Sequence, residues 1–80
     1  MDARYTQNRM ILQHLKEIGK ITPALAIEEY GCYRLSARIH DLREQGHVIK
    51  TNHISRKNRF GHTVNFAEYE YQFSTDGGTE

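Results

Sequence analysis

Residues 21–47 read ITPALAIEEYGCYRLSARIHDLREQGH, and this stretch decides the fold. Thr22 is a good helix N-cap and Pro23 a good first helical residue, so the pair predicts a helix start. The helix is expected to end at Tyr30, because Gly31 can adopt the positive φ that closes a helix. The result is a short helix followed at once by a tight turn.

A further helix is predicted from about Cys32 or Tyr33 to Gln45, with Gly46 as its stop. Its expected buried stripe has helical spacing and consists of Leu35, Ile39 and Leu42. A turn of about three residues, centred on Gly31, cannot hold two helices flat against each other. The two helices are therefore expected to cross at a large angle, as in a helix-turn-helix.

Before this stretch, the sequence predicts a helix capped by Thr6 that runs to about Ile18 and ends at Gly19. Its apolar stripe is expected to be Ile11, Leu12, Leu15 and Ile18. Lys20 and Ile21 then form a short bridging strand. In the helix after it, the expected inner face is Ala26, Ile27 and Tyr30, with Leu25 pointing away.

After Gly46 the pattern changes to that of β-strands. Residues 47–54 are rich in β-branched side chains, and residues 64–73 alternate strongly. One face of the second strand is expected to cover the core with Ala67, Tyr69, Tyr71 and Phe73. Val64 and Phe66 have the opposite phase, which predicts a bulge or a twist near Phe66. Residues 55–63 are expected to form the basic tip of a hairpin.

The predicted order is helix, short strand, helix, turn, helix, strand, basic loop and strand. This is the order of a winged helix-turn-helix, an α+β fold with three helices and a small antiparallel sheet whose basic hairpin is the wing. We expect one domain over residues 1–75 and a flexible tail over residues 76–80.

Residues 21–50 resemble a family of small phage and prophage winged helix-turn-helix proteins. The resemblance lies in the Ile-Thr-Pro opening (residues 21–23), the Gly-Cys turn (residues 31–32) and the pattern Arg-Leu-x-Ala-Arg-Ile-x-Asp-Leu-Arg (residues 34–43) before a glycine. The rest of the chain is similar to the family in architecture only. The resemblance implies a DNA-binding fold.

The charge is unevenly distributed along the chain. The whole sequence has 11 Lys and Arg against 10 Asp and Glu, a net charge of +1. Residues 32–63 contain seven of these cations and two carboxylates, a net charge of +5, and four of the five histidines. A cationic middle of this kind is expected to face a polyanion. A merely solvated charged surface is the alternative.

The helix that follows the turn is expected to enter the DNA major groove. Its outward residues would then contact DNA: Tyr33, Arg34, Ser36, Ala37, Arg38 and His40. Arg34 could donate two hydrogen bonds to a guanine, and Ala37 could meet a thymine methyl group. For Arg38, an ion pair with Asp41 is the alternative, because the two residues are three positions apart. Asp41 and Glu44 would repel phosphate, so the C-terminal half is expected to leave the groove.

The basic loop supplies the second set of predicted DNA contacts, Arg56, Lys57 and Arg59. These side chains suit the phosphate backbone or an adjacent minor groove. Alternatively, such a tip is only solvated, or it protects the hairpin edge from pairing with other strands.

Other classes of function find little support in the sequence. Cys32 is the only cysteine, and no histidine has the spacing of a metal site, so we expect no catalytic residue, metal or cofactor. No apolar run approaches the roughly 20 residues that span a membrane. We expect a cytoplasmic protein that is not an enzyme.

The predicted function is sequence-specific binding of double-stranded DNA as a transcriptional regulator of a phage or prophage. A module of this size covers few base pairs, so a homodimer or tandem sites are expected. One alternative is an excision or architectural factor that bends DNA. Another is a phage inhibitor that binds a host protein through Leu25 and the acidic strand face (Glu68 and Glu70).

Overall fold

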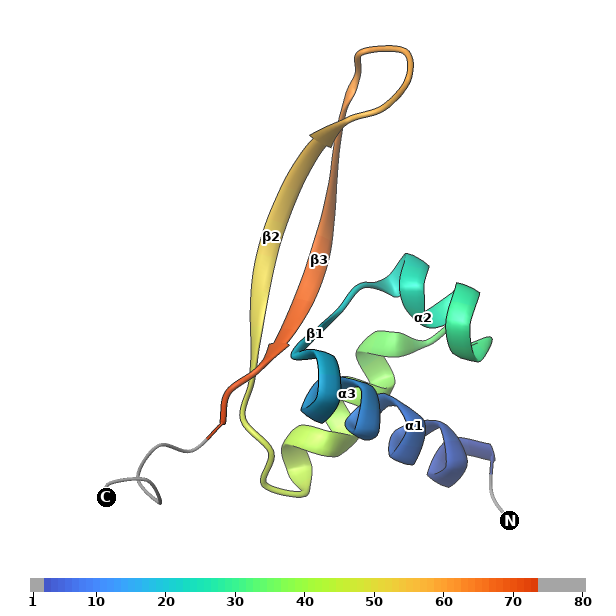
Figure 1. Cartoon of the computed structure of the whole chain (residues 1–80), viewed down its shortest axis with the longest axis vertical. Coiled ribbons are helices and arrows are strands. Elements are labelled where there is room, and N and C mark those ends of the chain that lie inside the picture. Colours follow the sequence, from blue (N-terminus) through green and yellow to red (C-terminus); the bar gives the residue numbers. More distant parts are fainter. Residues whose placement is uncertain (1–2, 74–80) are drawn as a thin grey trace.

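The computed structural model describes residues 3–73 and has three helices packed beside a hairpin (Figure 1). In chain order, the elements are α1 (Ala3–Ile18), β1 (Lys20–Ile21), α2 (Pro23–Tyr30), α3 (Leu35–Glu44), β2 (Ile49–Lys57) and β3 (Thr63–Tyr71). The sheet is antiparallel with the order β1-β3-β2. This architecture is the predicted winged helix-turn-helix. The predicted tail, residues 76–80, lies outside the described residues.

The core joins all three helices to the base of the sheet. Its buried side chains are Ile11, Leu15, Ile21, Ala26, Cys32, Leu35, Ile39, Leu42, Ile49 and Tyr69. The predicted inner face of α3 is confirmed, because all three of its members are buried. The base of the hairpin is thus held against the helices, while its other end projects well beyond them (Figure 1).

The short helix α2 begins and ends as its sequence predicts. The hydroxyl oxygen of Thr22 accepts a hydrogen bond from the backbone N–H of Leu25, which caps the helix. Gly31 lies in the left-handed region at φ 65°, and its N–H donates to the carbonyl of Ile27 at 2.9 Å. The helix α2 is therefore fixed at its start by the Thr22 side chain and at its end by the backbone of Gly31.

The buried faces of α1 and α2 differ from the predicted ones. Ile18 is exposed, because the chain reverses at Gly19 and Ile21 fills this end of the core instead. In α2 the inner face includes Leu25, which packs against the core, whereas Ile27 is exposed. The prediction that Leu25 points away was therefore wrong.

Two predicted helix starts also move. The first helix begins at Ala3, so Thr6 is an internal residue and not its cap. The helix after the turn begins only at Leu35, because residues 31–34 are needed to redirect the chain. Tyr33 and Arg34 consequently lie in the turn and not within α3.

The hairpin is longer and more regular than predicted. Pairing runs without interruption from Ile49↔Tyr71 to Lys57↔Thr63, so the predicted bulge near Phe66 is absent from these strands. Val64 and Phe66 keep their phase and lie on the face of the sheet away from the core. The loop is reduced to residues 58–62. Phe73 follows the end of β3 and is exposed, contrary to its predicted place in the core.

Candidate nucleic-acid interface

The outward face of α3 follows from the burial of its inward stripe. With Leu35, Ile39 and Leu42 against the core, the opposite face presents Ser36 and His40 to solvent and leaves Ala37 half-buried. These are small or polar side chains, so a partner can approach the helix closely. A helix with such a face fits the DNA major groove.

The turn before α3 adds two larger side chains to this face. Tyr33 and Arg34 are both exposed, and Arg34 occupies the N-cap position without making a side-chain cap. Buried Cys32 anchors the turn beneath them, since its N–H donates to the carbonyl of Ala26 at 3.0 Å. The turn therefore holds an aromatic ring and a guanidinium at the start of α3.

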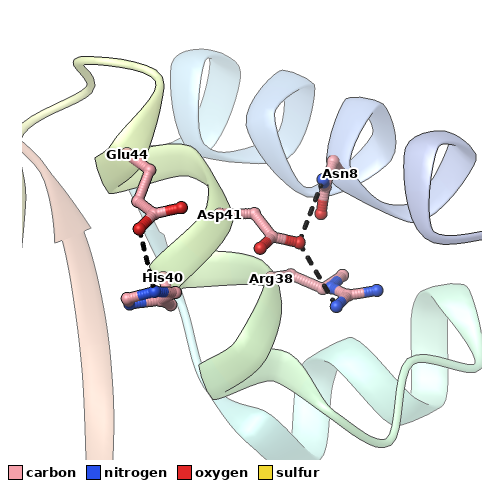
Figure 2. A network of polar contacts seen from close by, with 5 residues as sticks. All are labelled: Asn8, Arg38, His40, Asp41 and Glu44. Carbon is pink, nitrogen blue, oxygen red and sulfur yellow. Dashed lines mark hydrogen bonds and ion pairs between the residues drawn. The ribbon is translucent and has the colours of Figure 1, made fainter.

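Arg38 lies apart from the other predicted contacts. Its side chain is 13% exposed and forms an ion pair with Asp41, with 3.2 Å between Nη2 and Oδ2. Asp41 Oδ2 also accepts a hydrogen bond from Asn8 of α1 at 3.3 Å (Figure 2). The alternative reading of Arg38 as the ion-pair partner of Asp41 is confirmed. We therefore leave Arg38 out of the interface proposed below.

The same ion pair changes the charge of the face. Asp41 is directed toward α1 and is paired with Arg38 of its own helix (Figure 2). The remaining carboxylate of α3, Glu44, lies at the far end of the helix and contacts His40, with 3.3 Å between Oε2 and Nε2. The first two turns of α3 consequently carry no outward carboxylate.

Arg43 links α3 to the hairpin, a role that the sequence analysis missed. Its Nε and Nη2 donate to the carbonyl oxygen of Ile49 at 3.1 and 2.6 Å, and Nη2 also donates to Thr51 Oγ1 at 2.9 Å. Its guanidinium carbon lies 6.0 Å from the centroid of the Tyr69 ring. The sequence could not predict this contact, because no helical or strand spacing relates Arg43 to Ile49.

The three predicted cations of the wing occupy different places. Arg56 lies on the outer face of the hairpin, where its guanidinium carbon is 5.7 Å from the centroid of the Phe66 ring. Lys57 is one position further along β2 and so lies on the opposite face. Arg59 is exposed in the loop. The wing therefore presents positive charge on both faces and at its tip.

The loop between the strands is organised by Asn58. Its Oδ1 accepts hydrogen bonds from the N–H groups of Phe60 and His62, at 2.9 and 3.0 Å. Backbone bonds from Asn58 to the His62 carbonyl and from Gly61 to the Asn58 carbonyl, both 2.9 Å, close the turn. Phe60 is held outward at the tip, and the sequence analysis did not single it out. The sequence feature that could have indicated Phe60 is that it is a single apolar residue within a cationic loop.

No three His, Cys, Asp or Glu side chains among residues 3–73 come close enough together to hold a metal ion. Cys32 is fully buried beneath the turn. None of the described helices is long and apolar enough to cross a membrane. What the geometry does assemble is a polar helix face, an exposed turn and a cationic hairpin, joined through Arg43.

Three helices with a β-hairpin wing define a winged helix-turn-helix domain. Comparison with known protein families matches residues 6–70 to a winged helix-turn-helix domain family, and the chain belongs to that family. Searches of curated proteins and of solved structures found no match. Membership of this family indicates DNA binding.

Proposed function

We propose that this protein binds double-stranded DNA sequence-specifically and acts as a transcriptional regulator of a phage or prophage. In this proposal, the first two turns of α3 enter the major groove while the wing holds the phosphate backbone. The phage assignment rests on the resemblance of residues 21–50 and not on the geometry of the site.

The observation that carries the proposal is the distribution of charge around the exposed faces. Arg34, Lys57 and Arg59 are exposed, and Asp41 of α3 is paired with Arg38. No acidic residue occurs between Gln45 and Ala67. The first two turns of α3 and the tip of the wing therefore carry cations and no unpaired carboxylate, while the exposed Glu28 and Glu29 lie on α2 and Glu44 lies at the far end of α3.

In this proposal, α3 with the turn before it contacts bases, and the wing contacts phosphates. Arg34 has the fork of donors that matches guanine O6 and N7, while Ser36 and His40 can donate or accept hydrogen bonds at base edges. Tyr33 would contact a phosphate or stack in the groove, and Ala37 would meet a thymine methyl group. Lys57, Arg59 and Arg56 would neutralise phosphates, which positions the protein without reading sequence.

Regulation would follow from occupancy of a promoter by two or more copies. One module spans few base pairs, so we expect a homodimer or adjacent sites in the cytoplasm. Bound protein would block or recruit the transcription machinery.

The proposal is tested by repeated selection of bound duplexes from a random library at moderate salt. Enrichment of one sequence motif, with bound copies at regular spacing, is the expected result. Recovery of duplexes without any shared motif would contradict sequence-specific recognition, and recovery of none would contradict DNA binding.

A further inference from the structure

Phe60 is the most prominent apolar side chain at the free end of the molecule. It is 77% exposed in the loop that joins β2 to β3, at the end of the hairpin furthest from the helices (Figure 1). A single exposed apolar residue is ordinary on a protein surface. Two features of its surroundings distinguish this one.

The first feature is that the loop holds Phe60 in a defined position. Its own N–H donates to Asn58 Oδ1 at 2.9 Å, and the next residue, Gly61, adopts the positive φ of 81° that the turn requires. Together with the bonds that link Asn58 to His62 and Gly61, four hydrogen bonds hold the loop. A loop backbone held in this way loses little further conformational freedom on binding, so the position from which the ring projects is defined in advance.

The second feature is the charge around the ring. Arg59 precedes it, and Arg56 and Lys57 lie at the end of β2. A partner that fits an apolar ring surrounded by cations must combine negative charge outside with an apolar surface inside. Double-stranded DNA offers this combination, because its phosphates surround the stacked faces of its bases.

An anionic membrane surface offers a similar combination, but the loop fits it less well. Insertion into lipid requires a broad apolar face, whereas the neighbours of Phe60 in the loop are Asn58, Arg59, Gly61 and His62. One ring on a narrow β-ribbon is the size of a gap between two base pairs. The observations therefore favour DNA.

We propose that Phe60 is an apolar wedge that enters the DNA minor groove next to the major groove occupied by α3. There the ring would partly unstack one base step. The inference rests on the proposed DNA binding and deepens it. Apolar wedges of this type kink the duplex and increase the protein surface that it contacts. The protein would thus distort its site as well as read it.

The length of the wing is suited to this placement. Each strand has nine residues, which corresponds to about 30 Å. Along the DNA axis, half a helical turn separates a major groove from the flanking minor groove, about 17 Å. The hairpin can therefore cover that distance while its base stays bound to the helices.

The sequence contains no tryptophan, which allows a direct test. In the Phe60→Trp variant, the indole is the single tryptophan fluorophore at the tip. We expect its emission to be strongly quenched when the duplex obtained by selection is added, because the ring stacks on bases. Phe73→Trp is the matched control, since Phe73 is also exposed but lies at the opposite end of the hairpin. Its emission is expected to change little.

A second measurement reports on the DNA. Energy transfer between dyes on the two duplex ends should increase on binding of wild-type protein, should be largely lost with Phe60→Ala and should be retained with Phe60→Leu. We expect Phe60→Ala to weaken binding about tenfold, the order of one lost base–aromatic contact. Because Phe60 is outside the core, the circular dichroism spectrum should not change.

The outcomes separate the wedge from DNA binding itself. If the duplex binds normally but the indole emission of Phe60→Trp and the duplex end-to-end distance stay unchanged, the wedge is wrong and the proposed function stands. If no duplex binds wild-type protein, both are wrong. If the Phe60→Trp emission responds only to vesicles of equal phosphatidylcholine and phosphatidylserine, the tip binds membrane and the wedge is overturned.

Discussion

The guanidinium of Arg43 donates to the carbonyl oxygen of Ile49, with 2.6 Å between Nη2 and the oxygen. Arg43 is in the last turn of α3, and Ile49 is the first residue of β2. This contact therefore joins the helix proposed to read DNA to the hairpin proposed to hold it. Thr51 and the ring of Tyr69 complete the surroundings of the guanidinium.

Replacing Arg43 should weaken the contact between α3 and the hairpin. We expect Arg43→Ala to lower the free energy of unfolding by about 1–2 kcal/mol, since hydrogen bonds from a charged group are lost at a site still open to water. DNA affinity should fall as well, because α3 and the wing no longer keep one orientation. Urea unfolding and fluorescence anisotropy measure the two effects.

Arg43→Gln keeps part of the hydrogen bonding without the charge and is the companion variant. An unchanged unfolding free energy in Arg43→Ala would show that the contact does not hold the hairpin.

Arg34→Ala should alter recognition and not general affinity. At the selected duplex we expect a loss of about 1–3 kcal/mol of binding free energy, the range for a two-pronged contact with guanine. Binding to random duplex should change little. Arg34→Lys retains the charge but not the planar fork, so it should also lose specificity. Equal weakening on both duplexes would refute base reading by Arg34.

Much of the fold was accessible from the sequence, for local reasons. Thr22, Pro23 and Gly31 act on the backbone next to them, so the start and end of α2 could be predicted. The stripe of α3 has an unambiguous helical period. By contrast, Ile18 and Leu25 were assigned to the wrong environments, because their exposure depends on how the chain packs after each helix ends.

The candidate site was predictable in composition but less so in arrangement. The cationic middle of the chain was evident, yet two of its arginines do not face outward as free charges. Arg38 pairs with Asp41, and Arg43 caps the carbonyl of Ile49. Spacing indicated the first pairing, whereas the second depends on the path of residues 45–48. The placement of Phe60 at the tip also needed the loop geometry.

The Arg38–Asp41 ion pair and the His40–Glu44 contact of α3 should differ in their effect on stability. The side chains of Arg38 and Asp41 are 13% and 23% exposed, so Arg38→Ala leaves a carboxylate without its partner in a poorly hydrated place. We expect a loss of about 2–3 kcal/mol in unfolding free energy. His40 and Glu44 are 70% and 69% exposed, and Glu44→Gln should change it by less than about 0.5 kcal/mol.

Thermal or urea unfolding of these two variants is the measurement. If both variants lost the same unfolding free energy, the difference in burial between the two contacts would have no effect on their contribution to stability. A small effect in both would return Arg38 to the set of residues free to contact DNA.

Glu70 should make stability depend on pH in the acid range. The hydrogen bond that Asn52 donates at 3.0 Å, together with the charges of Lys20 and Lys50, lowers the pKa of Glu70 below its usual 4.5, against the opposing effect of burial. A carboxylate with a lowered pKa stabilises the fold above about pH 4.5. That contribution disappears as the pH falls through the pKa of the folded state.

Unfolding free energies measured down through pH 4.5 in wild type and Glu70→Gln test this dependence. We expect a shallower decline in the variant. Parallel curves would show that the Asn52 contact does not affect the titration of Glu70.

The central claim is that the start of α3 and the wing together bind DNA, and the salt dependence of binding tests it most directly. Anisotropy with a random duplex across a salt series compares wild type with Lys57→Ala/Arg59→Ala, and with Lys16→Ala/Lys20→Ala, which removes the same charge elsewhere. Wild-type affinity should fall steeply with salt, and the wing variant should reduce the slope of log K against log salt by about two. The control should keep the wild-type slope. Equal slopes in all three proteins, or no binding at low salt, would contradict the account.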